Sequence, residues 1–143
     1  MPTRPRITTI LPCTDAASAT KFFVRLGFTA PTQEEKSMWD SYLLLSHPNG
    51  SDIHLRELGE DEAGWLPPLK NPFGIYVYTA DVEALAVEFA GEIIEQAKTA
   101  EVKEWGMLEF SVNGPDGCLV RVGWPVEESD VGEKKAGGES GSK

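Results

Sequence analysis

The sequence carries one pattern twice. A Pro-Asn-Gly turn at residues 48–50 precedes one apolar stretch, and a Pro-Asp-Gly turn at 115–117 precedes another, 67 residues later. The two helix starts, at Asp15 and Asp81, lie 66 residues apart. An offset shared by a turn and a helix start indicates two copies of one supersecondary unit. Two such copies can enclose a cavity, so the repeat also predicts where a binding site would lie.

Each copy has the element order of a βαβββ module. In the first copy, strands are predicted at 7–13, 28–32, 39–46 and 52–58, with a helix from Asp15 to Gly27. In the second, they are predicted at 73–79, 92–96, 105–112 and 118–124, with a helix from Asp81 to Gly91. Aspartate accepts bonds from free N–H groups of a first helical turn, and glycine ends a helix in the left-handed conformation. The predicted fold class is α+β: two βαβββ modules form a curved mixed sheet around a concave pocket, with helices on the convex face.

The chain is predicted to form one domain over residues 6–126. Module 1 covers about 6–58, a connection covers 59–72, and module 2 covers about 73–126. Prolines at 67, 68 and 72 exclude a helix in the connection. The charged run at 34–36 is expected to be a solvated loop. Residues 127–143 are rich in Gly, Ser, Glu and Lys and are predicted to be a disordered tail, because they cannot bury enough apolar surface.

The composition of the chain restricts the classes of molecule that it could bind. The formal net charge is −10, which argues against binding to nucleic acid or to an anionic membrane and is compatible with a cationic ligand. No apolar run approaches the ~20 residues of a membrane span, and no signal peptide opens the chain, so the cytoplasm is expected. The two cysteines, Cys13 and Cys118, lack metal-type spacing and are expected to be free and buried.

Alternation along the strands separates side chains beneath the helices from those on the concave face. The all-apolar sets belong beneath the helices, so His54 and Arg121, at equivalent positions of the two copies, share the concave face. The predicted ligand-binding set is Tyr42, His54, Trp65, Tyr76, Tyr78, Trp105, Met107, Glu109 and Arg121. An aromatic wall with a few polar groups suits a small-molecule site. The alternative is that these aromatics fill the centre of a dimer or of a closed barrel.

Several motifs resemble those of the vicinal oxygen chelate superfamily, which includes glyoxalase I, extradiol dioxygenases and bleomycin resistance proteins. The opening resembles it at Leu-Pro-Cys-Thr-Asp (11–15), Phe-Phe (22–23) and Leu-Gly-Phe (26–28). The final hairpin resembles it at Trp-Gly (105–106), Phe110 and 113–120. The resemblance covers about Arg6 to Val126 and implies paired βαβββ modules.

Metal-dependent members of that superfamily place a His or Glu ligand on the first and last strand of each module. The resemblance carries these positions to Thr8, His54, Gly74 and Arg121, of which only His54 can ligate a metal. A divalent metal needs several donors at one point. We therefore expect no metal, no cofactor and no catalytic residue.

Without those metal ligands, the sequence resembles the bleomycin resistance branch of the superfamily. Members of that branch lack the metal, are acidic and form dimers. They sequester a cationic glycopeptide antibiotic and do not transform it. The predicted function is therefore non-enzymatic binding of a small molecule in an aromatic cleft of a homodimer. Arg121 departs from that branch by disfavouring a cation, so a neutral or anionic ligand stays open. The alternatives are a metal-dependent glyoxalase-like lyase or dioxygenase with atypical ligands, and a dimeric scaffold with no small ligand.

Overall fold

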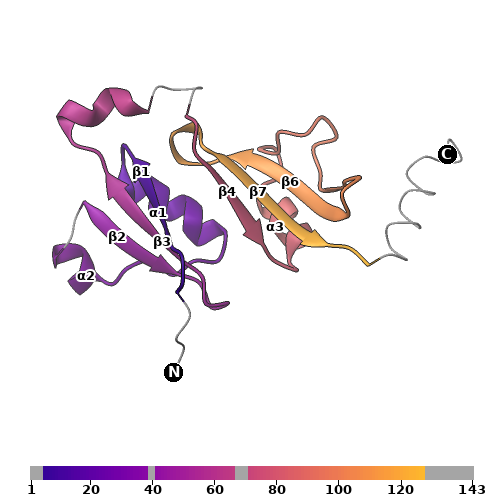
Figure 1. The fold of residues 1–143 in the computed structure, drawn as a ribbon, viewed down its shortest axis with the longest axis horizontal. Helices are drawn as coiled ribbons and strands as arrows, with labels where there is room; N and C mark the ends of the chain where they lie inside the picture. Colours follow the sequence, from indigo (N-terminus) through magenta and orange to yellow (C-terminus); the bar gives the residue numbers. More distant parts are fainter. Residues whose placement is uncertain (1–4, 39–40, 67–70, 128–143) are drawn as a thin grey trace, which may run out of the picture. The chain divides into compact units, whose positions relative to one another are not determined.

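The computed structural model describes residues 5–38, 41–66 and 71–127, and the chain has the α+β class predicted from its sequence (Figure 1). Contacts divide it into two compact units. The first holds the residues up to Asn71 together with the turn Gly114–Gly117, and the second holds the stretch from Pro72 to Asn113 and the residues from Cys118 onward. The predicted tail falls almost wholly outside the described residues, as do the predicted strand residues Trp39 and Asp40.

The described part of the first unit has a three-stranded mixed sheet in the order β1-β3-β2. Its strands are β1 (Thr9–Cys13), β2 (Tyr42–Ser46) and β3 (Asp52–Glu57). β3 lies in the middle, parallel to β1 and antiparallel to β2. The hairpin between β2 and β3 turns at Gly50, whose φ of 97° suits glycine.

Helix α1 (Ala16–Arg25) covers one face of this sheet. Asp15 has an extended backbone and accepts hydrogen bonds from the N–H groups of Ala17 and Ser18, so it caps the helix as predicted. Alternate strand residues are buried beneath the helix together with its inner side chains: Leu11, Cys13, Ala16, Ala19, Phe23, Leu43, Leu45, Ile53 and Leu55. Apolar burial on this one face is what holds the unit together.

Two local predictions for the first unit are wrong. The strand predicted at 28–32 is reduced to one bridge between Thr29 and Ser46, since Pro31 has no N–H to continue a ladder. The run expected to be a loop forms helix α2 (Gln33–Met38). Thr32 and Glu35 cap it reciprocally, because each side chain accepts a hydrogen bond from the other residue's N–H.

The connection after β3 begins with the 3-10 helix η1 (Glu60–Trp65), so the prediction that prolines keep the whole connection free of helix is wrong. The prolines at 67 and 68 lie beyond η1 and outside the described residues. The Glu62 carboxylate accepts a hydrogen bond from the Gly59 N–H at 2.8 Å, which fixes the start of η1. Proline acts only on the turn that contains it and on the residue before it.

The second unit has, in its described part, a four-stranded sheet in the order β4-β7-β6-β5. Its strands are β4 (Gly74–Tyr78), β5 (Glu101–Val102), β6 (Met107–Asn113) and β7 (Leu119–Pro125). β7 runs parallel to β4 and antiparallel to β6. This repeats the order of the first unit, with β7 in the place of β3.

Helix α3 (Val82–Glu88) covers one face of the second sheet. Side chains buried on this face or by the helix include Val82, Phe89, Phe110, Val112, Val120 and Val122. The helix starts one residue after Asp81, as predicted, but the Asp81 side chain makes no capping hydrogen bond, so the predicted cap is wrong. Trp124, placed with this apolar set by the alternation, is 45% exposed because it lies near the end of β7.

The strand predicted at 92–96 is also reduced to a single bridge, between Ile93 and Val112. The reason lies in Glu95, whose carboxylate accepts hydrogen bonds from the N–H and hydroxyl of Ser111. A side chain thus takes the donor that a neighbouring strand would have used. Short strand β5, which the sequence pattern does not indicate, pairs with β6 instead.

The Pro-Asp-Gly turn between β6 and β7 groups with the first unit. The Asp116 carboxylate accepts hydrogen bonds from the N–H and hydroxyl of Thr14, and Asn71 donates to the Asp116 carbonyl at 3.1 Å. In the first copy, the matching Asn49 accepts a bond from the Ser51 N–H within its own turn. The two turns therefore share a sequence pattern and differ in their partners.

Both cysteines lie in the described residues and are buried thiols that form no disulfide, as predicted. None of the helices in the described ranges is both long enough and apolar enough to cross a membrane.

Candidate functional site

The face of the second sheet that lies opposite α3 is called the open face here, and it is defined by Tyr76, Tyr78, Trp105, Glu109 and Arg121. Strand register places these side chains together. Tyr76 lies opposite Arg121 across β4 and β7, and Tyr78 lies opposite Gly123. Gly123 in turn lies opposite Glu109 on β6. The alternation predicted for this part of the site is therefore present.

Glu109 is the centre of the open face. Its side chain is 2% exposed, and one carboxylate oxygen accepts hydrogen bonds from the Tyr76 hydroxyl at 2.5 Å and from the Trp105 indole Nε1 at 3.4 Å. A buried carboxylate is costly unless donors satisfy it, and these two aromatic side chains supply the donors. The polar tips of both rings thus point at one atom.

Gly123 makes this arrangement possible. Tyr76 comes from β4 and Glu109 from β6, so the tyrosine must cross β7 to reach the carboxylate. A Cβ at Gly123 would come within 3.0 Å of the Tyr76 Cζ atom and closer still to its hydroxyl oxygen. Any side chain at this position would displace the phenol ring. The sequence contains a signal for this, because a glycine inside a strand often marks the close approach of another group.

The Tyr76 hydroxyl is held in its protonated form. Burial is the main cause that raises its pKa well above the ordinary tyrosine value, and the hydrogen bond to the Glu109 carboxylate raises it further. The Arg121 guanidinium offsets part of this increase. Tyr76 is therefore a hydrogen-bond donor to Glu109 over the whole physiological pH range.

The remaining side chains of the open face are accessible. Tyr78 is 59% exposed and Trp105 60% exposed, while the Tyr76 and Tyr78 ring centroids lie 4.7 Å apart. Arg121 is exposed, and Met107 is half-buried at the start of β6. Exposed rings beside a fixed polar anchor provide stacking surfaces for a planar molecule.

The equivalent face of the first unit is built from different groups. The Tyr42 hydroxyl and His54 Nδ1 are hydrogen-bonded at 2.7 Å. His54 lies between the exposed side chains of Ile10 and Leu44, its register partners on β1 and β2. These two members of the predicted set therefore lie among exposed apolar side chains.

Trp65 is brought to this unit by the 3-10 helix η1. The Arg56 guanidinium lies 5.8 Å from the Trp65 ring centroid and forms an ion pair with Glu62 at 2.5 Å. The Gly59 N–H and the Arg56 hydrogen bond lower the pKa of Glu62. Arg56 was not in the predicted site set, although its β3 position, two residues after His54, places it on the same face.

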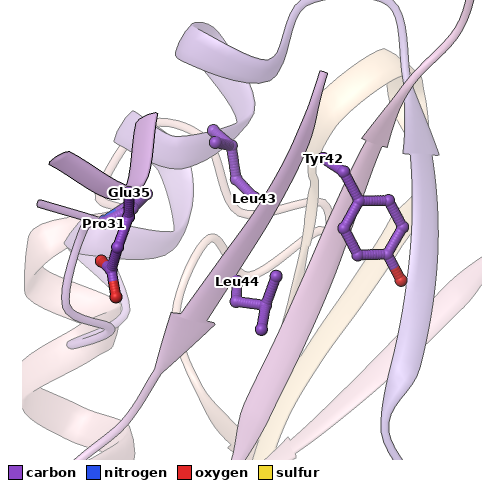
Figure 2. A pocket seen from close by; sticks show the side chains of 5 residues that line it. All are labelled: Pro31, Glu35, Tyr42, Leu43 and Leu44. Carbon is purple, nitrogen blue, oxygen red and sulfur yellow. The ribbon is translucent and has the colours of Figure 1, made fainter. Parts of the chain in front are cut away.

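A small pocket lies beside the edge strand β2 of the first unit, lined by Pro31, Glu35, Tyr42, Leu43 and Leu44. Figure 2 shows Leu43 and Leu44 between Glu35 on one side and Tyr42 on the other. The pocket has a volume of about 180 Å³, smaller than the ~300–1,000 Å³ of a typical ligand pocket. Of the predicted site residues, it includes Tyr42. Glu35 in its lining comes from α2, a helix that the sequence pattern did not indicate.

The four positions to which the resemblance carries metal ligands offer few suitable donors in this chain. Thr8 and His54 are engaged in hydrogen bonds, to Asp52 and Tyr42 respectively, and Gly74 has no side chain. Arg121 carries a positive charge that it does not lose. Within the described ranges, no three His, Cys, Asp or Glu side chains gather closely enough to hold a metal. The donor set therefore does not fit a divalent cation at these positions.

The cysteines offer no obvious nucleophile in the described structure. Cys13 is 0% exposed, and burial, followed by the Asp116 carboxylate, raises its pKa to about 12. A thiol with such a pKa is almost entirely protonated at neutral pH. Cys118 is also buried.

The structure thus brings the predicted residues together in two groups. Tyr42, His54 and Trp65 lie in the first unit, whereas the other six lie in the second: Tyr76, Tyr78, Trp105, Met107, Glu109 and Arg121. That His54 and Arg121 share one concave face stays a prediction. Gly123 and Arg56 are the two residues that the pattern missed and the contacts identify.

Comparison with solved structures shows which known proteins have a similar fold. A bleomycin-binding protein complexed with bleomycin has 18% identity and a TM-score of 0.61, over 86% of this chain and 100% of that one. A bleomycin resistance determinant encoded on the transposon Tn5 has 20% identity and a TM-score of 0.63, over 87% and 100% of the two chains. A glyoxalase/bleomycin resistance protein/dioxygenase from Nocardioides has 14% identity and a TM-score of 0.63, over 90% and 88%. No protein-family model matches the sequence, and no curated protein matches it significantly.

The chain therefore has the fold shared by these three solved structures. This confirms the resemblance at the level of the fold. Because one fold can carry many functions, the function has to be argued from the site.

Proposed function

We propose that this chain binds and sequesters a small molecule with a planar ring system on the open face of its second unit, without transforming it. The Tyr76–Glu109–Trp105 contact carries the proposal, because it fixes two aromatic side chains by their polar tips. Trp105 keeps 60% of its surface exposed for a guest. Fixed rings bind tightly because little side-chain entropy is lost on binding.

The charge of the chain supports a ligand that includes a cationic group. The formal net charge is −10, which favours a cationic guest over an anionic one. The structural neighbours named for binding bleomycin, or for resistance to it, give a first probe of this class. Arg121 lies on the same face and opposes a cation, so the bound molecule would have to place its positive group away from that side chain.

We include in the proposal that the chain acts as a homodimer with an aromatic cleft. Large apolar side chains are exposed on both units, such as Ile10 at 53% in the first and Tyr78 at 59% in the second. A second copy that covered them would remove apolar surface from water. Light scattering over a range of protein concentrations should give twice the mass of one chain; a single-chain mass at high concentration would overturn this part.

Calorimetric titration with metal-free bleomycin tests the binding proposal. We expect saturable binding that Trp105→Ala weakens by about tenfold or more, as removal of a central aromatic contact does. Trp124→Ala is the matched control, since Trp124 is also part-exposed but its position in β7 assigns it to the opposite face. It should change the affinity by less than about twofold. Absence of binding, or equal losses in the two variants, would contradict the drug-binding form of the proposal.

A further inference from the structure

The geometry points to Glu109 as a positioning residue: its carboxylate, reached across Gly123, orients Tyr76 and Trp105 for the ligand and does not itself contact the ligand. This inference rests on the proposed function and assigns a role within the same site. It replaces the prediction from sequence, which counted Glu109 among the ligand contacts.

The first argument is burial. Glu109 is 2% exposed, whereas Trp105 is 60% exposed and Tyr78 59% exposed. A ligand arriving at the open face meets the rings first. The carboxylate oxygen that faces them already accepts two hydrogen bonds, from the Tyr76 hydroxyl and the Trp105 indole.

The second argument is that the two hydrogen-bond donors come from different parts of the chain. Tyr76 comes from β4, while Trp105 precedes β6, four residues before Glu109. Without a shared acceptor these side chains would turn independently about their χ angles, and a long exposed side chain loses entropy when a ligand fixes it. One buried carboxylate orders both rings before binding.

The third argument is Gly123. The phenol ring lies over this residue, and even a methyl group there would meet the Tyr76 Cζ atom and hydroxyl oxygen. The neighbouring β7 residues on the same face, Arg121 and Pro125, both carry side chains. A strand that is otherwise filled with side chains thus leaves one gap, at the point where the tyrosine must pass to reach Glu109.

The role can be tested with two substitutions of the same residue. Glu109→Gln keeps an oxygen acceptor and removes the charge, whereas Glu109→Leu removes the acceptor and keeps a similar volume. Glu101→Gln is the matched control, because Glu101 lies opposite Glu109 on β5 and is paired with Lys103. The full chain, labelled with ¹⁵N, reports on Trp105 through its indole N–H resonance, which Trp105→Phe identifies by its loss.

We expect Glu109→Leu to move the Trp105 indole resonance, Glu109→Gln to move it part of the way, and Glu101→Gln to leave it in place. With bleomycin as the probe, Glu109→Gln should keep affinity within about threefold and Glu109→Leu should weaken it by about tenfold or more. If Glu109→Leu does not fold, Tyr76→Phe replaces it, since loss of one donor should also move the Trp105 resonance.

Two outcomes would overturn the inference. A Trp105 resonance that ignores Glu109→Leu and Tyr76→Phe would show that the carboxylate does not orient the indole. An affinity that falls as far in Glu109→Gln as in Glu109→Leu would show that the ligand needs the charge itself. If wild-type protein does not bind bleomycin, the drug-binding form of the proposed function fails, while the resonance shifts alone decide the positioning role.

Discussion

The two units use the same helix-covered core and differ on the opposite face. In the first, the polar groups are part-exposed: Arg56 pairs with Glu62 of η1, and Tyr42 pairs with His54. In the second, a buried carboxylate, Glu109, holds two aromatic side chains across a glycine. The comparison teaches that the repeat is kept where apolar burial holds each unit together, and has diverged where a ligand would bind.

The largest expected effect tests the shared core. Phe23 and Phe89 occupy equivalent helix positions, 66 residues apart, and each is 0% exposed. Replacing either by alanine should lower the free energy of unfolding by about 3–5 kcal/mol, because each leaves a cavity. Urea denaturation of the two variants measures this. A loss below about 1 kcal/mol in one of them would show that the cores are not equivalent.

A smaller loss is expected at Gly123, which has no counterpart of the same role in the first unit. Gly123→Ala should destabilise the chain by about 1–3 kcal/mol, because the new methyl group overlaps Tyr76. The matched control is Gly64→Ala, where an added Cβ would meet nothing within 4 Å. In the double variant with Tyr76→Phe the hydroxyl is gone, so part of the loss should be recovered. Strict additivity of the two substitutions would argue against the overlap.

The helix starts provide a third comparison. Asp15 has the extended backbone of an N-cap, with φ −145° and ψ 102°, and its carboxylate accepts from the first helical turn. Asp81 has φ −89° and ψ 33°, and among the described contacts its side chain makes no capping bond. Asp15→Ala should therefore lower the thermal midpoint by a few degrees, and Asp81→Ala should leave it unchanged. Equal thermal midpoints for Asp15→Ala and Asp81→Ala would contradict the difference in capping between the two helices.

The Asp15 effect should also depend on pH. Hydrogen bonding to Ser18, through its hydroxyl and N–H, lowers the pKa of Asp15 in the folded chain. A depressed folded-state pKa means that the stabilisation is present above the unfolded pKa, near 3.8, and is lost as pH falls through the folded value. The difference in thermal midpoint between wild type and Asp15→Ala should therefore be largest at pH 7 and should disappear in acid. A gap independent of pH would contradict this assignment.

The smallest effect separates the two polar arrangements by their response to salt. The Arg56–Glu62 pair is part-exposed, so high ionic strength should screen it, and Glu62→Gln should change stability little. The Tyr76–Glu109 bond is part-buried, but its acceptor Glu109 is 2% exposed and its donor is neutral, so salt should leave it intact. The indole resonances of Trp65 and Trp105 report on the two sites. A Trp105 resonance that shifts with salt as much as that of Trp65 would contradict the contrast.

Much of the fold was predictable, because its signals are local or periodic. The Asp15 cap, the Gly50 turn and the alternation of β3 and β7 follow from backbone chemistry and from one buried face per sheet. The strands predicted at 28–32 and 92–96 failed for local reasons too: Pro31 lacks a donor, and Glu95 takes the donor of Ser111. Helix α2 was missed because its charged residues lack an apolar period.

The sequence predicted where the residues of the candidate site lie, but it did not predict what each of them does. Alternation placed Tyr76, Trp105 and Glu109 on one face of the second sheet, and their hydrogen bonds show that they meet there. The same alternation could not say that Glu109 would be buried beneath the two rings. Burial depends on how side chains from β4 and β6 close over β7, and a linear sequence contains no such distance.

By itself, the sequence determined the doubled module, the helix-covered cores and the lack of metal-donor side chains at three of the four positions that the resemblance assigns to metal ligands. These follow from residue type and spacing, which act over a few residues at a time. Only the tertiary structure decided that Gly123 is the gap through which Tyr76 reaches Glu109, and that the same carboxylate also holds Trp105. The contact between Tyr76 and Glu109 joins separate strands, so it exists only once the sheet has set its register.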